Sequence, residues 1–138
     1  MPAPVRLHKV MRHTLSIPGT LPNLNQYITQ LNINKFRGSK LKRDTESYIA
    51  AHIKHQLKGV RCVGPVTVEF NWYEPDKKRD IDNVAFAKKF IFDALVTCGV
   101  LANDGWACVS GFSDSFAVDR DNPRVEVVLH EQEVAAYA

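Results

Sequence analysis

The stretch VTVEFNWY, residues 66–73, decides the fold class of this chain of 138 residues. Apolar and polar side chains alternate along it, in the order Val66, Thr67, Val68, Glu69, Phe70, Asn71, Trp72 and Tyr73. Because successive side chains of a strand point to opposite faces, this alternation predicts a strand with one buried face. Such a face needs neighbouring strands beside it and a layer of helices over it.

Further strands are predicted on both sides of that stretch. Alternation over residues 11–17, ended by a Pro-Gly pair, predicts a strand, and alternation over residues 124–130 predicts the last one. Weaker strands are expected at residues 107–112 and 116–119, and these two could form one interrupted strand. The tail after Glu131 is expected to be a short helix or frayed.

A first main helix is predicted in front of the central strand. Its apolar periodicity runs from about Glu46 to Lys58, with Asp44 and Thr45 as candidate N-caps and Gly59 as the stop. The preceding residues 32–42 are polar and basic, and they contain Gly38. They predict a surface loop, which follows a short helical turn near residues 26–31.

A second main helix is predicted from Asn83 to Cys98, with Gly99 at its end. It is apolar over most of its circumference, with a stripe of Val84, Ala87, Ile91, Leu95 and Cys98 flanked by Phe86, Phe90 and Phe92. One small sheet cannot cover such a helix on both sides, so a partner subunit in a homodimer is predicted against it. The alternative is that the first helix and the loops cover the second side.

The order of these elements is β, α, β, α and then further β strands. This order predicts an α+β (α/β) fold, with a small mixed sheet and two main helices. The chain has the length of a single domain, residues 1–138, in which the first ten residues are expected to be loosely ordered.

Composition indicates an ordinary globular protein, with 45% hydrophobic and 24% charged residues. The net charge of +3 is mildly basic and names no partner by itself. The odd number of cysteines, Cys62, Cys98 and Cys108, argues against a disulfide framework, and each is predicted to be a buried, reduced thiol. No signal peptide or membrane-spanning stretch is evident, so we expect a cytoplasmic protein with no membrane partner.

The segment Asp80-Ile81-Asp82 is the strongest candidate for chemistry. Two aspartates one residue apart in an extended chain point to the same side. Their carboxylates repel each other unless a cation joins them, and Mg²⁺ prefers such oxygen ligands. The alternative is a solvated turn in which Asp82 caps a helix. Asp104 is the third acidic candidate; its alternative is an ordinary Asn-Asp-Gly turn, and its sequence distance does not place it beside Asp80.

Together these motifs resemble the RusA family of Holliday-junction resolvases. The resemblance rests on residues 79–83 (RDIDN), Lys89, residues 92–95 (FDAL), Gly99 and residues 103–104, and it is strongest from 77 to 106. It implies a dimeric α/β protein that needs Mg²⁺ and resolves four-way DNA junctions by paired symmetric nicks in recombination and repair. Many members of the family are encoded by phages or prophages.

The resemblance also implies roles for single residues. Asp80, Asp82 and Asp104 match the metal-binding carboxylates, and Lys89 matches the catalytic lysine. The family usually places that lysine four residues after the second aspartate, where this chain has Phe86. Alignment on residues 92–95 gives the role to Lys89 through a three-residue insertion, about one helical turn. Lys88 is the other candidate, but it is expected to point toward the apolar stripe.

Basic residues in two clusters are the candidate DNA-binding residues. They are Lys35, Arg37, Lys40, Lys42 and Arg43 in the first cluster, and Lys77, Lys78 and Arg79 in the second. They would hold the phosphate backbone without reading bases, although a solvated basic loop is the alternative. No nucleotide cofactor is expected. Two other functions stay open: a non-catalytic dimeric protein that binds DNA structures, and a less selective metal-dependent DNA nuclease.

Overall fold

Strand β2 (Val66–Glu74) lies inside a four-stranded sheet whose order is β1-β4-β2-β3. The other strands are β1 (His8–Pro18), β3 (Val109–Val118) and β4 (Arg124–Val134) in this computed structural model, which describes residues 8–134. Strand β4 is antiparallel to β1 and β2, whereas β3 is parallel to β2. The sheet is therefore mixed, as predicted.

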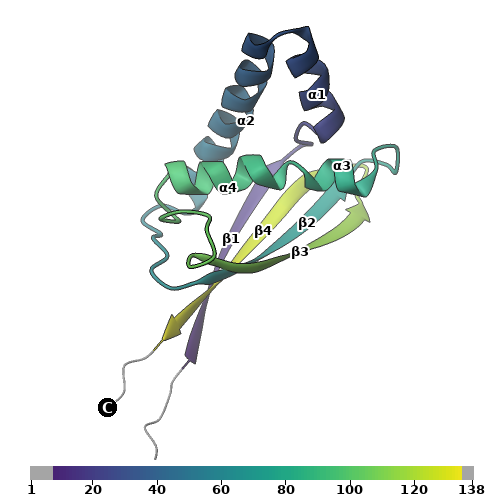
Figure 1. Ribbon diagram of the computed structural model, residues 1–138. Helices are drawn as coiled ribbons and strands as arrows, with labels where there is room; N and C mark the ends of the chain where they lie inside the picture. The colour runs from purple at the N-terminus through teal and green to yellow at the C-terminus, as the bar shows by residue number, and fades with distance from the viewer. Residues whose placement is uncertain (1–7, 135–138) are drawn as a thin grey trace, which may run out of the picture.

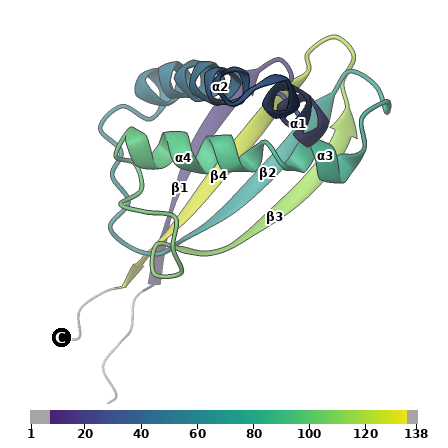
Figure 2. The same cartoon turned by 45° about the horizontal axis from the view of Figure 1, so that its top comes forward.

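Within the described residues, four helices accompany the sheet: α1 (Leu24–Ile33), α2 (Lys35–Gln56), α3 (Ile81–Ala85) and α4 (Lys88–Thr97). They all lie on one face of the sheet, where α3 and α4 cross the strands and α2 packs beside α4 and against β1 (Figures 1 and 2). The central strand has the predicted alternation, since Val66, Val68, Phe70 and Trp72 are buried beneath the helices. The α+β class is confirmed.

The predicted loop at residues 32–42 is wrong, because helix α2 already begins at Lys35. Asn34 is its N-cap, and the Asn34 side chain accepts a hydrogen bond from the backbone N–H of Arg37 (2.8 Å). Gly38 does not interrupt the helix. It lies where α1 passes closely, since a Cβ at this position would come within 2.2 Å of Leu31 Cδ2. Asp44 and Thr45 are therefore interior residues of α2 rather than caps.

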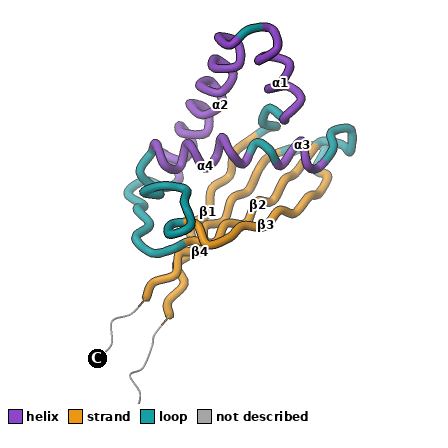
Figure 3. Tube along the Cα trace, viewed as in Figure 1, coloured by secondary structure: helices purple, strands orange, loops and turns teal. Residues whose placement is uncertain are grey.

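The second predicted helix is divided into α3 and α4 at Phe86 and Ala87 (Figure 3). Backbone hydrogen bonds here join residues three apart, from Ala87 N to Val84 O (3.2 Å) and from Lys89 N to Phe86 O (3.1 Å). The Phe86 ring stacks on the ring of Tyr27 in α1, with centroids 5.8 Å apart. The prediction of one continuous helix from Asn83 to Cys98 is therefore wrong.

Helix α2, the first main helix of the prediction, covers the second side of α4. The structure therefore supports the alternative in which this helix, and not a partner subunit, buries that side. Phe90, Ile91 and Leu95 of α4 are buried, as are Ile49 and Ile53 of α2. The apolar circumference of α4 therefore gives no argument for a partner subunit. A dimer remains a proposal that needs another surface.

The C-terminal half differs from expectation in two places. Strand β3 is continuous, because each residue from Thr67 to Glu74 of β2 has a partner along it. Strand β4 continues through Val134, so the expected helix or frayed end directly after Glu131 is wrong.

Strand β1 begins at His8, so the last of the first ten residues are ordered. The expectations for residues 1–7 and 135–138 lie outside the described residues.

The three cysteines are free thiols, as predicted, but each of them is partly exposed rather than buried. Among the helices described for residues 8–134, none combines the length and the apolar character that crossing a membrane requires.

Candidate active site

Asp80 and Asp82 lie where the chain leaves β2 and turns into α3. Asp80 occupies the N-cap position with an extended backbone (φ −67°, ψ 142°), and its side chain makes no capping hydrogen bond. Asp82 lies in the first turn, where its Oδ1 accepts a hydrogen bond from the backbone N–H of Asn83 (2.9 Å). Both side chains are exposed, and Asp82 is not the helix cap.

The two aspartates line an open pocket of about 690 Å³ that also includes Glu74 and Asp76. Arg79 neutralises Glu74 through two hydrogen bonds, from Nε to Oε1 (2.7 Å) and from Nη2 to Oε2 (3.0 Å). Asp76 Oδ1 accepts a hydrogen bond from the backbone N–H of Lys78 (2.9 Å). Asp80 and Asp82 thus offer exposed carboxylate oxygens within a pocket whose other acids are already engaged.

Arg79 holds the pocket in place. Besides its contact with Glu74, its Nη1 donates to the backbone carbonyl of Leu21 (2.8 Å) and to Gln26 Oε1 (3.3 Å). These bonds join the loop after β2 to the start of α1. Its contacts are therefore those of a residue that positions the Asp80 loop, rather than of one that extends toward DNA.

Lys88 points toward the sheet, as expected, and forms an ion pair with Asp114 of β3. The pair is mostly covered, because the exposed fractions of the two side chains are 18% and 20%. Asp114 also accepts a hydrogen bond from Trp72 Nε1 (2.8 Å), and the Lys88 ammonium lies 4.3 Å from the centroid of the Phe112 ring. Asp82, Lys88 and Asp114 line a common pocket.

Sequence reasoning missed Asp114 because residues 107–119 predicted only weak strands. The signal was a single acid between Phe112 and Phe116 on the apolar side of that alternation. An acid at such a position predicts a basic partner on the covering helix, since a buried carboxylate needs a compensating charge.

Lys89 points away from the sheet and forms ion pairs with Asp93 (Nζ to Oδ1, 3.2 Å) and Asp104 (Nζ to Oδ2, 3.2 Å). The hydrogen bonds from Lys89 to Asp93 and Asp104 raise the pKa of the ammonium above its usual value. Lys89 is therefore a cation at any physiological pH. Its side chain is 58% exposed, so it can approach a ligand.

Asp104 lies in the loop after α4 and belongs to a different pocket from Asp80 and Asp82. That pocket has a volume of about 540 Å³ and is lined by Phe92, Trp106 and Phe112 among others. The Trp106 side chain is 98% exposed beside it. The structure therefore brings Asp104 to Lys89.

The three predicted metal ligands do not form one cluster in this structure. Within residues 8–134, one group of three potential ligands has its donor atoms all within 4.8 Å of one another, and it is His13, Cys62 and Glu131. Asp80 and Asp82 share one pocket, and Asp104 lies in another. The Lys88–Asp114 pair is beside Asp82, while Lys89 is held at Asp104.

The predicted DNA-binding residues differ in whether an acidic side chain already pairs with them. Lys35, Arg37 and Arg43 are exposed on α2, and Lys77 is exposed in the loop after β2. Lys78 in that loop is 87% exposed, and its ammonium lies 4.0 Å from Asp76 Oδ2. In contrast, the Lys40 ammonium lies 2.6 Å from Asp44 Oδ2. The Lys42 ammonium lies 3.3 Å from Glu46 Oε2 and 3.5 Å from Asp93 Oδ2.

The donor set at Asp80 and Asp82 fits a hard divalent cation. Both donors are exposed carboxylates, and Mg²⁺ binds through one or two carboxylates while it keeps several waters. The Lys88 ammonium of α4 lines a pocket together with Asp82, whereas Lys89 lies beside Asp104, and such ammonium groups can neutralise an oxyanion. Acidic side chains near a lysine ammonium are an arrangement that enzymes which hydrolyse phosphodiesters use.

The sequence places the chain within that class of enzymes. Residues 18–130 match the model of the family described as Endodeoxyribonuclease RusA. The match covers more than half of the chain, and the protein belongs to the RusA family of endodeoxyribonucleases. No curated protein matches the chain.

Proposed function

We propose that this protein is a Mg²⁺-dependent Holliday-junction resolvase, which cuts four-way DNA junctions by paired symmetric nicks as a homodimer. The proposal rests on the family and above all on one observation: Asp80 and Asp82 offer exposed carboxylates in an open pocket at the start of α3. DNA recombination and repair would be its setting.

Asp80 and Asp82 would hold the metal, and Asp104 would join them on DNA binding. When bound there, Mg²⁺ supplies Lewis acidity toward a phosphoryl oxygen and toward an attacking water. Asp104 is exposed and lies in a loop, so it could leave its ion pair with Lys89 and turn toward Asp82. Binding of DNA would favour that movement, because a phosphate competes with Asp104 for the lysine.

Lys89 would be the catalytic lysine, and Lys88 a positioning residue. Lys89 is exposed and stays protonated, so it can stabilise negative charge on the phosphate or on the leaving oxygen. Lys88 is largely covered and is neutralised by Asp114, which fixes α4 on β3. The two neighbouring lysines thus support different parts of the same site.

DNA would be held by the exposed basic residues of α2 and of the loop after β2. Lys35, Arg37 and Arg43 project from one element, and Lys77 and Lys78 from the other. Contacts of this type bind phosphates and weaken as salt rises. Arg79, Lys40 and Lys42 would contribute less, because acidic neighbours or fold contacts already engage them.

A synthetic four-way junction, incubated with and without Mg²⁺, tests the proposal. Wild-type protein should nick opposing strands in a Mg²⁺-dependent manner. Asp80→Asn and Asp82→Asn should abolish nicking, since each removes a metal-binding charge, yet retain binding of the junction in a mobility-shift assay. Asp121→Asn, an exposed aspartate in the turn between β3 and β4, is the control and should cut normally.

Two other results of the same assays would support the alternative functions, a non-catalytic binding protein and a less selective nuclease. A wild-type protein that shifts the junction but leaves its strands intact is a binding protein. Equal cleavage rates on junction, flap and linear duplex define a less selective nuclease. Full activity in both Asp80→Asn and Asp82→Asn would remove the proposed site.

A further inference from the structure

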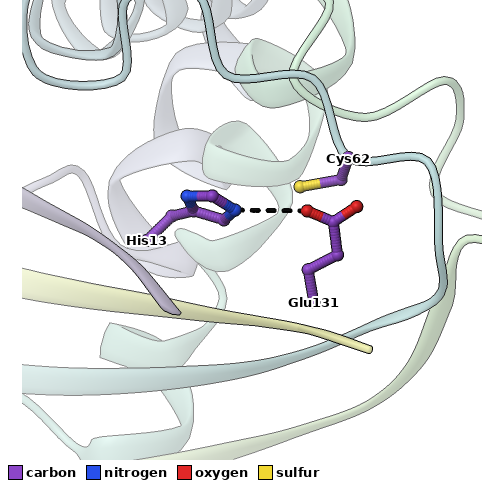
Figure 4. Close-up of side chains that lie close together, drawn as sticks. All are labelled: His13, Cys62 and Glu131. Atoms are coloured by element: carbon purple, nitrogen blue, oxygen red, sulfur yellow. Dashed lines mark hydrogen bonds and ion pairs between the residues drawn. The ribbon is translucent and has the colours of Figure 1, made fainter. Parts of the chain in front are cut away.

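A second cluster of metal-binding side chains lies away from the acidic pocket. His13 of β1, Glu131 of β4 and Cys62 of the segment before β2 point toward one another (Figure 4). Cys62 precedes β2 and Asp80 follows it, so the two sites lie at opposite ends of that strand. The cluster is therefore independent of the proposed nuclease site.

The geometry of the cluster suits a single metal ion. One nitrogen, one sulfur and one oxygen donor lie within 4.8 Å of one another, and His13 Nε2 is 3.2 Å from Glu131 Oε1. Zn²⁺ binds these three types of donor at about 2.0–2.3 Å, so bound ligands lie some 3–4 Å apart. Small rotations of the side chains are enough to reach that arrangement.

Glu131 is held in position by the backbone of the segment that carries Cys62. Its Oε2 accepts hydrogen bonds from the backbone N–H groups of Val63 (2.7 Å) and Gly64 (3.2 Å). The other oxygen, Oε1, faces His13 and is the one that could bind a metal. Outer hydrogen bonds that orient a ligand in this way are typical of built metal sites.

Gly64 allows this close approach of the backbone. A Cβ at residue 64 would lie 2.1 Å from the backbone carbonyl oxygen of Gln132, so a larger residue would push the segment away from β4. The cluster is mostly covered but can be reached by an ion, because the side chains of His13 and Glu131 are 14% and 6% exposed.

The Cys62 thiol is the third member, and its hydrogen bond to the Glu131 carboxylate uses the thiol proton. His13 and Glu131 form a complete pair without it. The Cys62 sulfur lies within 4.8 Å of the donor atoms of His13 and Glu131, so it extends this pair to three donors of different types. A divalent ion would replace the thiol proton, since it binds thiolate and carboxylate together.

We propose that His13, Cys62 and Glu131 bind one Zn²⁺ ion, with a water in the fourth position, and that this ion joins β1, β4 and the segment before β2. Binding displaces the proton of the Cys62 thiol, which passes to solvent. The mixed nitrogen, sulfur and oxygen donors favour Zn²⁺ over Mg²⁺, whereas the Asp80 pocket offers only oxygen.

The experiment measures metal binding to the full-length chain carrying Asp80→Asn and Asp82→Asn, which removes the acidic pocket as a competing site. Dialysis against Zn²⁺ in excess Mg²⁺, followed by metal analysis, should find one equivalent of Zn²⁺ per chain. Cys62→Ser and His13→Ala should each lose that equivalent. Cys98→Ser and Cys108→Ser are the matched controls and should retain it.

Co²⁺ provides a spectroscopic check, because a bound thiolate gives a charge-transfer absorption with this ion. The absorption should appear in the parent chain and in Cys98→Ser, and should be absent in Cys62→Ser. Less than a tenth of an equivalent of Zn²⁺ in a folded parent chain would overturn the proposal. So would equal Zn²⁺ content in Cys62→Ser and Cys98→Ser. Neither result depends on DNA cleavage, so the proposed nuclease function is tested separately.

Discussion

Lys88 and Lys89 are neighbours in the sequence and have opposite surroundings in the structure. Lys88 lies under α4 against Asp114, and Lys89 lies on its exposed side between Asp93 and Asp104. The division of the helix at Phe86 and Ala87 sets the rotation at which α4 begins. A single substitution at each lysine can therefore separate a role in catalysis from a role in folding.

We predict that Lys89→Ala lowers the rate of junction nicking by about 10²-fold or more, the effect of removing a group that stabilises transition-state charge. Its free energy of unfolding should stay close to that of the wild type, because its ion pairs are exposed. Nicking under single-turnover conditions and urea denaturation measure the two quantities.

Lys88→Ala should show the reverse pattern. It leaves Asp114 largely covered without its cation, which costs about 1–3 kcal/mol of stability. Substrate binding and the nicking rate of the folded fraction should change much less than in Lys89→Ala. A large loss of nicking in Lys88→Ala, with normal stability, would assign the catalytic role to Lys88 instead.

At the level of single residues, sequence reasoning found the acids that lie close together in the chain. Asp80 and Asp82 are two residues apart, so their common pocket follows from local geometry. His13 and Glu131 are 118 residues apart and meet only because β1 pairs with β4. Strand register is not visible in one sequence, so this contact could not be predicted.

Among the secondary-structure elements, the turn between β3 and β4 carries an ion-pair cluster. Arg124 lies 2.8 Å from Asp119 through Nη1 and Oδ2, and 2.8 Å from Glu126 through Nε and Oε1. Its guanidinium carbon also lies 3.9 Å from the centroid of the Tyr73 ring. These contacts fasten the turn to the end of β2.

This cluster predicts a pH dependence of stability. The hydrogen bond from Arg124, with further bonds from the backbone of the turn, lowers the pKa of Asp119 in the folded protein below its usual value. A carboxyl group with a lowered folded pKa stabilises the fold above its unfolded pKa. That contribution is lost as pH falls through the folded value.

Asp119→Asn removes this contribution. The variant should therefore unfold at a lower urea concentration than the wild type at neutral pH, and the difference should shrink in the acidic range below the usual aspartate pKa. Urea titrations at a series of pH values measure it. Asp121→Asn, in the same turn, is the control and should follow the wild type; a difference that stays constant down to strongly acidic pH contradicts the argument.

Elements with a strong local pattern were predicted well, and those that depend on tertiary contacts were not. The alternation of β2 and β4 identifies these strands without help from neighbours. The first turns of α2 were missed because Gly38 was taken as a helix breaker, whereas it serves the contact with Leu31. The division between α3 and α4 was missed because no proline or glycine marks it.

In the whole molecule, the edge strand β3 is the surface that best fits a homodimer. Among the described strands, β3 pairs on one side only, with β2. Phe112, Phe116 and Val118 are 56%, 36% and 48% exposed along it. It has no lysine, arginine or proline, the residues that usually protect a free edge. The other edge strand, β1, carries Arg12 and Pro18.

If the chain forms the proposed homodimer through β3, Phe116→Glu should convert it into a monomer, because this substitution places a charge in an apolar interface. Light scattering after size-exclusion chromatography measures the mass. Ile33→Glu is the matched control, since this exposed apolar residue lies on α1, and it should leave the dimer intact. A monomeric wild type, or a dimer that survives Phe116→Glu and dissociates in Ile33→Glu, would exclude this interface.

The two tryptophans differ so strongly in environment that the protein contains its own optical reporter. Trp72 is 2% exposed and donates its indole N–H to Asp114, whereas Trp106 is 98% exposed, two residues from Asp104. Emission at long wavelength, and its quenching by a water-soluble quencher, should come mainly from Trp106. Loop movement around Asp104 can thus be followed by fluorescence in unlabelled protein, in real time and before any strand is cut.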